Sequence, residues 1–158
     1  MGRSRGGLST KIHVLCEGAG KPVVVTVTPG QQHESTQAAP LLDGVSIRGK
    51  PGPPRRRFGH VAGDKAYDSE GIRQDIRHRR SKPVIPHRKR SDGTYPESAQ
   101  GFDTETYRRR NVVERLIGRL KEFRRIATRY DKLAASFVCF ILLGFIRIWV
   151  KDLISYTA

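Results

Sequence analysis

The 158-residue sequence has few cysteines, few acidic side chains and no apolar run long enough to stand out at once as a membrane span. Cys16 and Cys139 are its only cysteines, and neither lies in a Cys-x-x-Cys or Cys/His spacing, which argues against a zinc site and a disulfide scaffold. We expect two reduced, buried thiols, as in a cytoplasmic protein. The first residues show no apolar segment of the secretory type, so we expect no signal peptide.

The scarcity of acidic residues leaves a large positive charge. Thirty Lys and Arg residues face 15 Asp and Glu residues, which gives a net charge of +15. Such an excess favours a polyanionic partner, because binding to phosphates releases condensed counterions. Nucleic acid is the first candidate and an anionic membrane surface the second. The length suits one domain over residues 1–158 with a modest core.

The C-terminal stretch is the most apolar part of the chain. Residues 133–146 carry no charge, which suggests a membrane span, but Arg147 and Lys151 follow closely. A span needs about 20 apolar residues. We therefore predict a helix over residues 133–156 that is buried on most sides, with Trp149 and the phenylalanines in the core. A membrane-associated basic protein remains the alternative.

The rest of the chain alternates between strand and helix patterns. Residues 9–16 and 22–28 are rich in β-branched side chains and flank a glycine-containing turn, which predicts an antiparallel hairpin. Further elements are expected in chain order: a short helix within 33–45, a proline-rich loop over 46–57, a strand over 58–62, a helix that Asp68 caps and that runs to Arg79, and an edge strand over 82–86. The order indicates an α/β fold with a few strands and covering helices.

One long helix is predicted from residue 103 or 104 to residue 129. Its apolar side chains have helical spacing: Val113, Leu116, Ile117 and Leu120. Four other residues would return to nearly one face of that helix: Tyr107, Arg110, Glu114 and Lys121. A surface helix with an Arg110–Glu114 pair, worth a few tenths of a kcal/mol, explains the same spacing.

Asp64 is the second acidic residue of interest. The strand over 58–62 should deliver it at the carboxyl end, where α/β sheets place ligands, although an aspartate in a Gly-Asp turn also has a purely structural use. If Asp64 and Glu114 converge, two hard carboxylates would suit Mg²⁺ or Mn²⁺. Two such ions, about 3.5–4 Å apart, support phosphoryl transfer. Arg110 and Lys121 could then hold the DNA backbone.

The spacing of Tyr107, Arg110, Glu114 and Lys121 resembles the Tyr-Arg-Glu-Lys signature of DDE-type bacterial insertion-sequence transposases. Three further stretches resemble the same family: GGLSTKIH at 6–13, GDKAYD at 63–68 and FRRIATRYDKL at 123–133. The resemblance implies a ribonuclease-H-like mixed sheet with flanking helices, in which Asp64 and Glu114 are the second and third catalytic, metal-binding acids. It also implies contact of Tyr107, Arg110 and Lys121 with DNA, and Mg²⁺- or Mn²⁺-dependent cleavage at transposon ends followed by strand transfer to target DNA.

The first acid of that family lies upstream of the GGLSTK stretch, where this sequence has no acidic residue. We therefore expect a chain that corresponds to the C-terminal part of a transposase and lacks the N-terminal strand of the sheet. Alone it would be inactive, and it would act with a further copy or an upstream transposase segment in the bacterial cytoplasm. The alternative is a non-catalytic DNA-binding remnant or inhibitor of the full-length enzyme. Three basic clusters are expected to contact phosphates without reading sequence: 55–57, 77–82 and 87–90.

Overall fold

The computed structural model describes residues 2–4, 7–47 and 58–155. The chain divides into two compact units, which are described separately. Met1–Gln32 and Asn111–Ala158 form what we call the hairpin unit, and His33–Arg110 form the middle unit. The predicted proline-rich loop lies outside the described residues except for Ser46 and Ile47, and so does the basic cluster 55–57.

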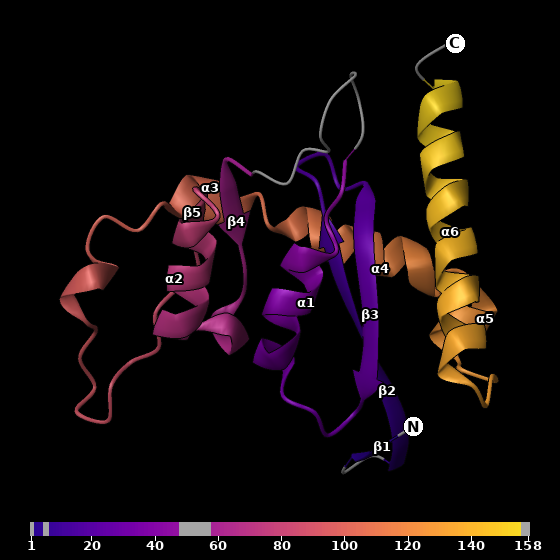
Figure 1. The fold of residues 1–158 in the computed structure, drawn as a ribbon, viewed down its shortest axis with the longest axis horizontal. Helices are drawn as coiled ribbons and strands as arrows, with labels where there is room; N and C mark the ends of the chain where they lie inside the picture. Colours follow the sequence, from indigo (N-terminus) through magenta and orange to yellow (C-terminus); the bar gives the residue numbers. More distant parts are fainter. Residues whose placement is uncertain (1, 5–6, 48–57, 156–158) are drawn as a thin grey trace. The chain divides into compact units, whose positions relative to one another are not determined.

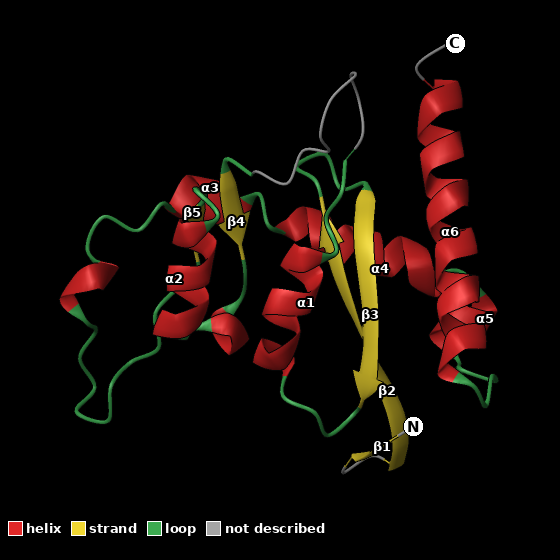
Figure 2. Ribbon diagram, in the orientation of Figure 1, coloured by secondary structure: helices red, strands yellow, loops and turns green. Residues whose placement is uncertain are grey.

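A long antiparallel hairpin forms the sheet of the hairpin unit, as predicted (Figures 1 and 2). Strands β2 (Gly7–Cys16) and β3 (Pro22–Pro29) pair in a register that sets Ile12 opposite Val27, and β1 (Gly2–Ser4) adds a short antiparallel edge to β2. The connecting turn closes where the N–H of Gly20 donates to the carbonyl of Glu17 at 2.8 Å. Gly20 has φ +87°, a conformation that favours glycine, so the sequence places this residue where the turn requires it.

Helices α4 (Asn111–Lys121), α5 (Arg124–Ala127) and α6 (Ala134–Ser155) complete the hairpin unit. Their buried apolar side chains form one core: Leu116, Leu120, Ile126, Phe137, Ile141, Phe145 and Ile148. Alternate residues of the hairpin pack against that core, among them Ile12, Val14, Val25 and Val27. The period of two in the strands and the helical spacing in α4 and α6 thus produce a single buried layer. In Figure 1, α4 runs across the hairpin and α6 lies beside β3.

The prediction that α6 is buried on most sides is wrong. The helix is present, but its outer face leaves large apolar side chains exposed: Leu142, Leu143, Ile146, Val150, Leu153 and Ile154. Trp149 is 37% exposed, so it lies at the border of the core rather than inside it. Its indole N–H donates to the carbonyl of Pro22 at 2.9 Å, and the Lys21 ammonium lies 5.0 Å from its ring centroid. No helix among the described residues is both long enough and apolar enough to cross a membrane.

The middle unit contains short elements around a two-stranded parallel sheet. The sheet pairs β4 (His60–Ala62) with β5 (Lys82–Val84). The other elements follow in chain order: η1 (Glu34–Gln37), α1 (Ala38–Asp43), η2 (Lys65–Tyr67), α2 (Glu70–His78), η3 (Glu97–Ala99) and α3 (Thr104–Arg108). Its buried apolar residues come from α1, α2 and β5 and the residues next to them: Ala38, Leu41, Leu42, Val45, Ile76, Val84 and Ile85.

The described strands thus form two small sheets, one antiparallel and one parallel. The mixed α/β class is confirmed, while the larger ribonuclease-H-like sheet and its missing N-terminal strand stay predictions. The arrangement of one catalytic domain over residues 1–158 also stays a prediction.

Candidate active site

Asp64 lies directly beyond the carboxyl end of β4, as predicted. Hydrogen bonding between β4 and β5 continues to Gly63, whose N–H donates to the carbonyl of Val84 at 3.2 Å. Asp64 then caps η2, where its Oδ1 accepts the N–H of Ala66 at 2.8 Å. The side chain is half-buried. A sheet end and a backbone hydrogen bond therefore both fix the position of this carboxylate.

Tyr67 borders the same turn and belongs to the stretch GDKAYD. Burial, and then the negative charges of Glu34 and Asp64, raises the pKa of Tyr67 to about 12. The phenol of Tyr67 is therefore neutral at physiological pH.

Asp68 is the centre of an ion-pair cluster that the sequence analysis did not find. We expected Asp68 to cap α2, but Ser69 occupies the cap position, and Asp68 instead binds Arg73. The Nη2 atom of Arg73 lies 2.7 Å from Oδ1 of Asp68, and the backbone N–H of Arg88 donates to Oδ2 at 2.6 Å. His87 Nδ1 lies 3.6 Å from Oδ1. Burial alone would raise the pKa of Asp68, but the hydrogen bonds and charges of these neighbours lower it overall.

Arg73 is the functional candidate that the sequence reasoning missed. Only 4% of the residue is exposed, and its Nη2 also donates to the carbonyl of Ile85 at 2.9 Å. A signal was available, because Arg73 precedes the buried Ile76 by three residues and so lies on the inward face of α2. A buried arginine needs an anionic partner, which Asp68 provides.

The predicted continuous helix over 103–129 is wrong, because the structure divides it into α3, α4 and α5. After α3 the N–H of Arg110 donates to the carbonyl of Tyr107 at 2.9 Å, a tight i to i−3 turn that ends the α-helical pattern. No proline or glycine marks this break. Asn111, followed by Glu114 three residues later, resembles a helix start and is the signal that could have found it.

The break separates the four residues that we expected on one helical face. Tyr107 and Arg110 belong to the middle unit, and Glu114 and Lys121 belong to α4 of the hairpin unit. Within the middle unit, the guanidinium of Arg110 lies 5.4 Å from the centroid of the Tyr107 ring, a cation–π contact. In α4, Glu114 and Lys121 are exposed, in the first and last turns. Each end of α4 thus carries the charge that complements its helix dipole.

The donor chemistry of Asp64 and Glu114 fits a hard divalent cation, since both offer carboxylate oxygens. The hydrogen bond from the N–H of Ala66 orients one oxygen of the Asp64 carboxylate. Over residues 2–4, 7–47 and 58–155, no group of three or more His, Cys, Asp or Glu side chains is placed to hold a metal ion.

Several expected phosphate-binding side chains already have intramolecular partners. Arg77 binds Glu70 at 2.8 Å, Arg79 binds both Asp43 and Asp75, and Lys82 binds Asp103 at 3.0 Å. The Arg77–Glu70 pair is more than half exposed on both sides, so a DNA phosphate could replace this carboxylate at small energetic cost. The contact of clusters 77–82 and 87–90 with phosphate stays a prediction.

The two cysteines differ from each other more than we expected. Cys16 is half-buried beside the core of the hairpin unit, but Cys139 is exposed, which corrects the prediction that both are buried. Burial, and then the charge of Glu17, raises the pKa of the Cys16 thiol to about 11. Neither thiol has a role in the candidate site.

Comparison with known proteins decides the family. The transposase DDE domain family matches residues 2–149, nearly the whole chain. The chain belongs to this family. The resemblance to DDE-type insertion-sequence transposases, first inferred from short stretches of sequence, is therefore confirmed.

Two curated relatives of this DDE-family chain carry transposase names. The protein named as a transposase for insertion sequence element IS6501 of Brucella ovis is 28% identical over 148 residues, which is 91% of this chain and all of the relative. The protein named as a transposase for insertion sequence element IS402 of Burkholderia cepacia is 34% identical over 143 residues, which is 90% of this chain and 62% of the relative. No solved structure matches this chain significantly.

Proposed function

We propose that this DDE-family protein functions in DNA transposition and contributes Asp64 and Glu114 to a metal-dependent centre that cleaves transposon ends and transfers a strand to target DNA. The family match over residues 2–149 supports the general activity. The observation that carries the site assignment is the position of Asp64 at the carboxyl end of β4, oriented by the N–H of Ala66. We also propose the ribonuclease-H-like arrangement that the family resemblance implies.

The carboxylates of Asp64 and Glu114 are the groups proposed to hold Mg²⁺ or Mn²⁺. When bound, such ions activate the attacking hydroxyl and stabilise the leaving oxygen. The role of these side chains is to present anionic oxygens from fixed backbone positions, one beyond a strand and one in the first turn of α4.

Lys121, Arg110 and Tyr107 are proposed to position the DNA backbone. Lys121 is exposed in the last turn of α4, so its ammonium can reach a phosphate as a point charge. The Tyr107 ring, against which the Arg110 guanidinium lies, limits the rotamers of that arginine before DNA binds. Such preorganisation reduces the entropy that a phosphate contact costs.

The Asp68 cluster is proposed to position Asp64 rather than to react. Arg73 connects Asp68 to the carbonyl of Ile85, and Ile85 follows β5, the strand that pairs with β4. The turn between Gly63 and Asp68 is therefore held at its strand end and at its helix end. A loss of Arg73 would shift Asp64 without touching the reacting atoms.

A cleavage and strand-transfer assay with Mn²⁺ tests the site assignment, using a DNA substrate that carries the ends of the parent element. Because this chain is expected to need an upstream segment or a second copy, the assay should use the complete transposase reconstituted with this chain. Asp64→Asn and Glu114→Gln should each lower the rate at least about a hundredfold, since each removes a charge from the metal centre.

Two control variants match the chemistry of the test variants. Asp92→Asn alters a second aspartate whose Oδ1 accepts a backbone N–H two residues later, in the same local geometry as Asp64. Glu122→Gln alters an exposed glutamate just after α4. Both should retain activity. DNA binding with no effect of Asp64→Asn or Glu114→Gln on strand transfer would instead support the non-catalytic remnant.

A further inference from the structure

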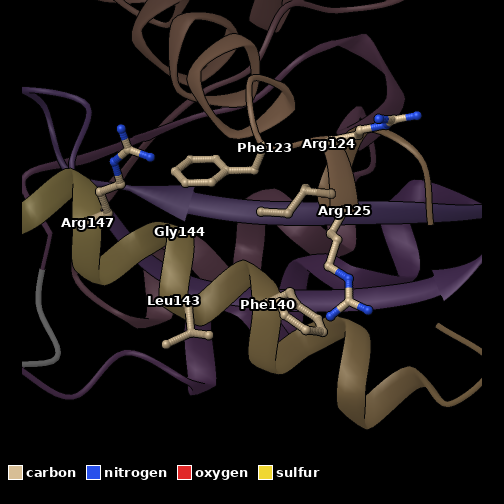
Figure 3. Close-up of a pocket in the computed structure, with 8 residues that line it drawn as sticks. Phe123, Arg124, Arg125, Phe140, Leu143, Gly144 and Arg147 are labelled. Atoms are coloured by element: carbon tan, nitrogen blue, oxygen red, sulfur yellow. The ribbon is translucent and has the colours of Figure 1, made fainter. Parts of the chain in front are cut away.

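A pocket in the hairpin unit lies outside every residue of the candidate active site. It occupies about 440 Å³ between the segment that enters α5 and the outer face of α6. The size falls within the range of small-molecule and single-group binding pockets. Figure 3 shows its aromatic walls, Phe123 and Phe140, together with the exposed Leu143 and the backbone of Gly144.

Each phenylalanine of this pocket makes a cation–π contact with an arginine. The guanidinium of Arg125 lies 4.3 Å from the centroid of Phe140, and that of Arg147 lies 5.2 Å from the centroid of Phe123. Both arginines are exposed, and both phenylalanines are only half-buried. In Figure 3 the two arginine–phenylalanine pairs lie at opposite ends of the pocket. Arg124 also lines the pocket, but its guanidinium points away from both rings. The pocket therefore combines stacking surfaces with two cations at its rim.

Gly144 keeps the pocket at its present depth. A Cβ atom at this position would lie 3.2 Å from Cδ1 of Ile126 and 3.2 Å from Cδ2 of Leu120, closer than most such contacts. The absence of a side chain lets α6 approach the start of α5, so that Phe123 and Phe140 share one hollow. The geometry of the pocket thus depends on a residue choice inside an otherwise regular helix.

We propose that this pocket binds an unpaired DNA base, with Arg125 and Arg147 contacting the phosphates on either side of it. Every base has a π-face that stacks on aromatic rings and on guanidinium planes, and such stacking tolerates any sequence. A duplex hides those faces, so the pocket selects DNA that is single-stranded or locally unpaired. The inference rests on the proposed function only in taking DNA as the partner.

Charge complementarity favours a nucleotide over an uncharged apolar segment. Both pocket rims carry arginine, and the whole chain has a net charge of +15. A peptide with only apolar side chains would leave both guanidinium groups without an anionic partner. A phosphate on each side of a stacked base satisfies the rings and the cations together.

Fluorescence anisotropy of the complete 158-residue chain, in EDTA, tests the pocket. The probes are a fluorescein-labelled single strand of about 16 nucleotides, long enough for a stacking site, and the same strand in a duplex. Phe140→Leu keeps an apolar side chain but removes the ring, and it should weaken single-strand binding roughly tenfold while duplex affinity changes less than about twofold. Thermal unfolding of the variant should match wild type, which shows that the fold is intact.

The neighbouring arginines provide a matched control. Arg125→Gln should weaken single-strand binding clearly more than Arg124→Gln, although both remove one positive charge from the same helix. Equal losses in the two arginine variants, or equal losses of single-strand and duplex binding in Phe140→Leu, would overturn the proposal. Binding of phosphatidylserine vesicles with no single-strand affinity would also overturn it and indicate a membrane surface. Because the assay contains no metal, its result does not depend on the roles of Asp64 and Glu114.

Discussion

Nη2 of Arg73 lies 2.7 Å from Oδ1 of Asp68, with 5% and 15% of the two side chains exposed. The pair is thus shielded from solvent, unlike the other ion pairs of α2. It joins the first turn of that helix to the turn that carries Asp64.

Arg73→Gln should destabilise the protein by about 3–5 kcal/mol, because it leaves the Asp68 carboxylate, only 15% exposed, without the guanidinium that it binds. Urea unfolding followed by circular dichroism measures the loss. Arg77→Gln is the control on the same helix, since its pair with Glu70 is more than half exposed on both sides, and it should cost less than about 1 kcal/mol. Equal costs for the two variants would contradict a special role for the buried pair.

Stability should fall in acid between about pH 4 and pH 2. The backbone N–H of Thr106 and then the Lys82 ammonium lower the pKa of Asp103 to about 2, and the pKa of Asp68 is also lowered. An unfolded aspartate has a pKa of about 3.9, so the unfolded chain binds protons first as the pH drops. The stabilisation from the ionised Asp68 and Asp103 carboxylates is therefore fully present above the unfolded pKa of about 3.9. It is lost as the pH falls through the lower pKa values of the folded protein. Urea unfolding at several pH values in this range gives the free energy of unfolding as a function of pH. That free energy should fall less steeply with decreasing pH in Asp68→Asn than in wild type. The same pH dependence in both proteins would be evidence against the ion-pair cluster.

The two thiols should react at very different rates. Cys139 is exposed, whereas Cys16 is half-buried and has a pKa raised to about 11. Since the thiolate is the reactive form, Ellman's reagent at about pH 8 should modify one thiol quickly and the other much more slowly. Cys139→Ser should remove the fast phase, and unfolding in urea should make both thiols fast. A fast phase that survives in Cys139→Ser would contradict the burial of Cys16.

Ile141→Ala should cost about 2–5 kcal/mol, because Ile141 has 0% exposure in the core of the hairpin unit and its truncation leaves a cavity. Leu142→Ala removes a comparable apolar side chain from the adjacent position of α6, but Leu142 is 44% exposed. This second change should cost less than about 1 kcal/mol. Chemical unfolding of the two variants compares the faces directly, and similar costs would mean that the outer face of α6 is covered in solution.

Mn²⁺ should raise the thermal unfolding temperature of wild type if the carboxylates form a metal site. At a free metal concentration ten times the Kd, the stabilisation is about 1.4 kcal/mol. Asp64→Asn and Glu114→Gln should each reduce the shift, and Asp92→Asn should not. A shift of the same size in all four proteins would assign the metal to other residues.

Local patterns predicted the elements that depend on neighbouring residues. The hairpin follows from alternating β-branched residues on both sides of a turn in which Gly20 takes positive φ. The position of Asp64 follows from a strand that ends just before Gly63, and the extent of α6 follows from its apolar composition. Each of these features depends on residues that are close together in the sequence.

The features that the sequence did not predict depend on distant groups or on energetic balances. Asp68 has good chemistry for a helix cap, but the buried Arg73 and the backbone of Arg88 compete for its oxygens. The break before Asn111 contains no helix-breaking residue, so intrinsic propensity gave no warning. Apolar composition predicted α6 but not which of its faces would remain exposed. The exposed face depends on which other elements pack against the helix, and composition does not contain that information.

The contact between Trp149 and Pro22 gives the protein a built-in spectroscopic probe. Trp149 is the only tryptophan in the sequence, and its indole N–H bonds to the first residue of β3 from the far part of α6. Its emission should therefore report, without any label, whether the C-terminal helix is docked on the hairpin. Arg147 at the pocket rim is two residues away, so the same signal can be followed while an oligonucleotide is titrated.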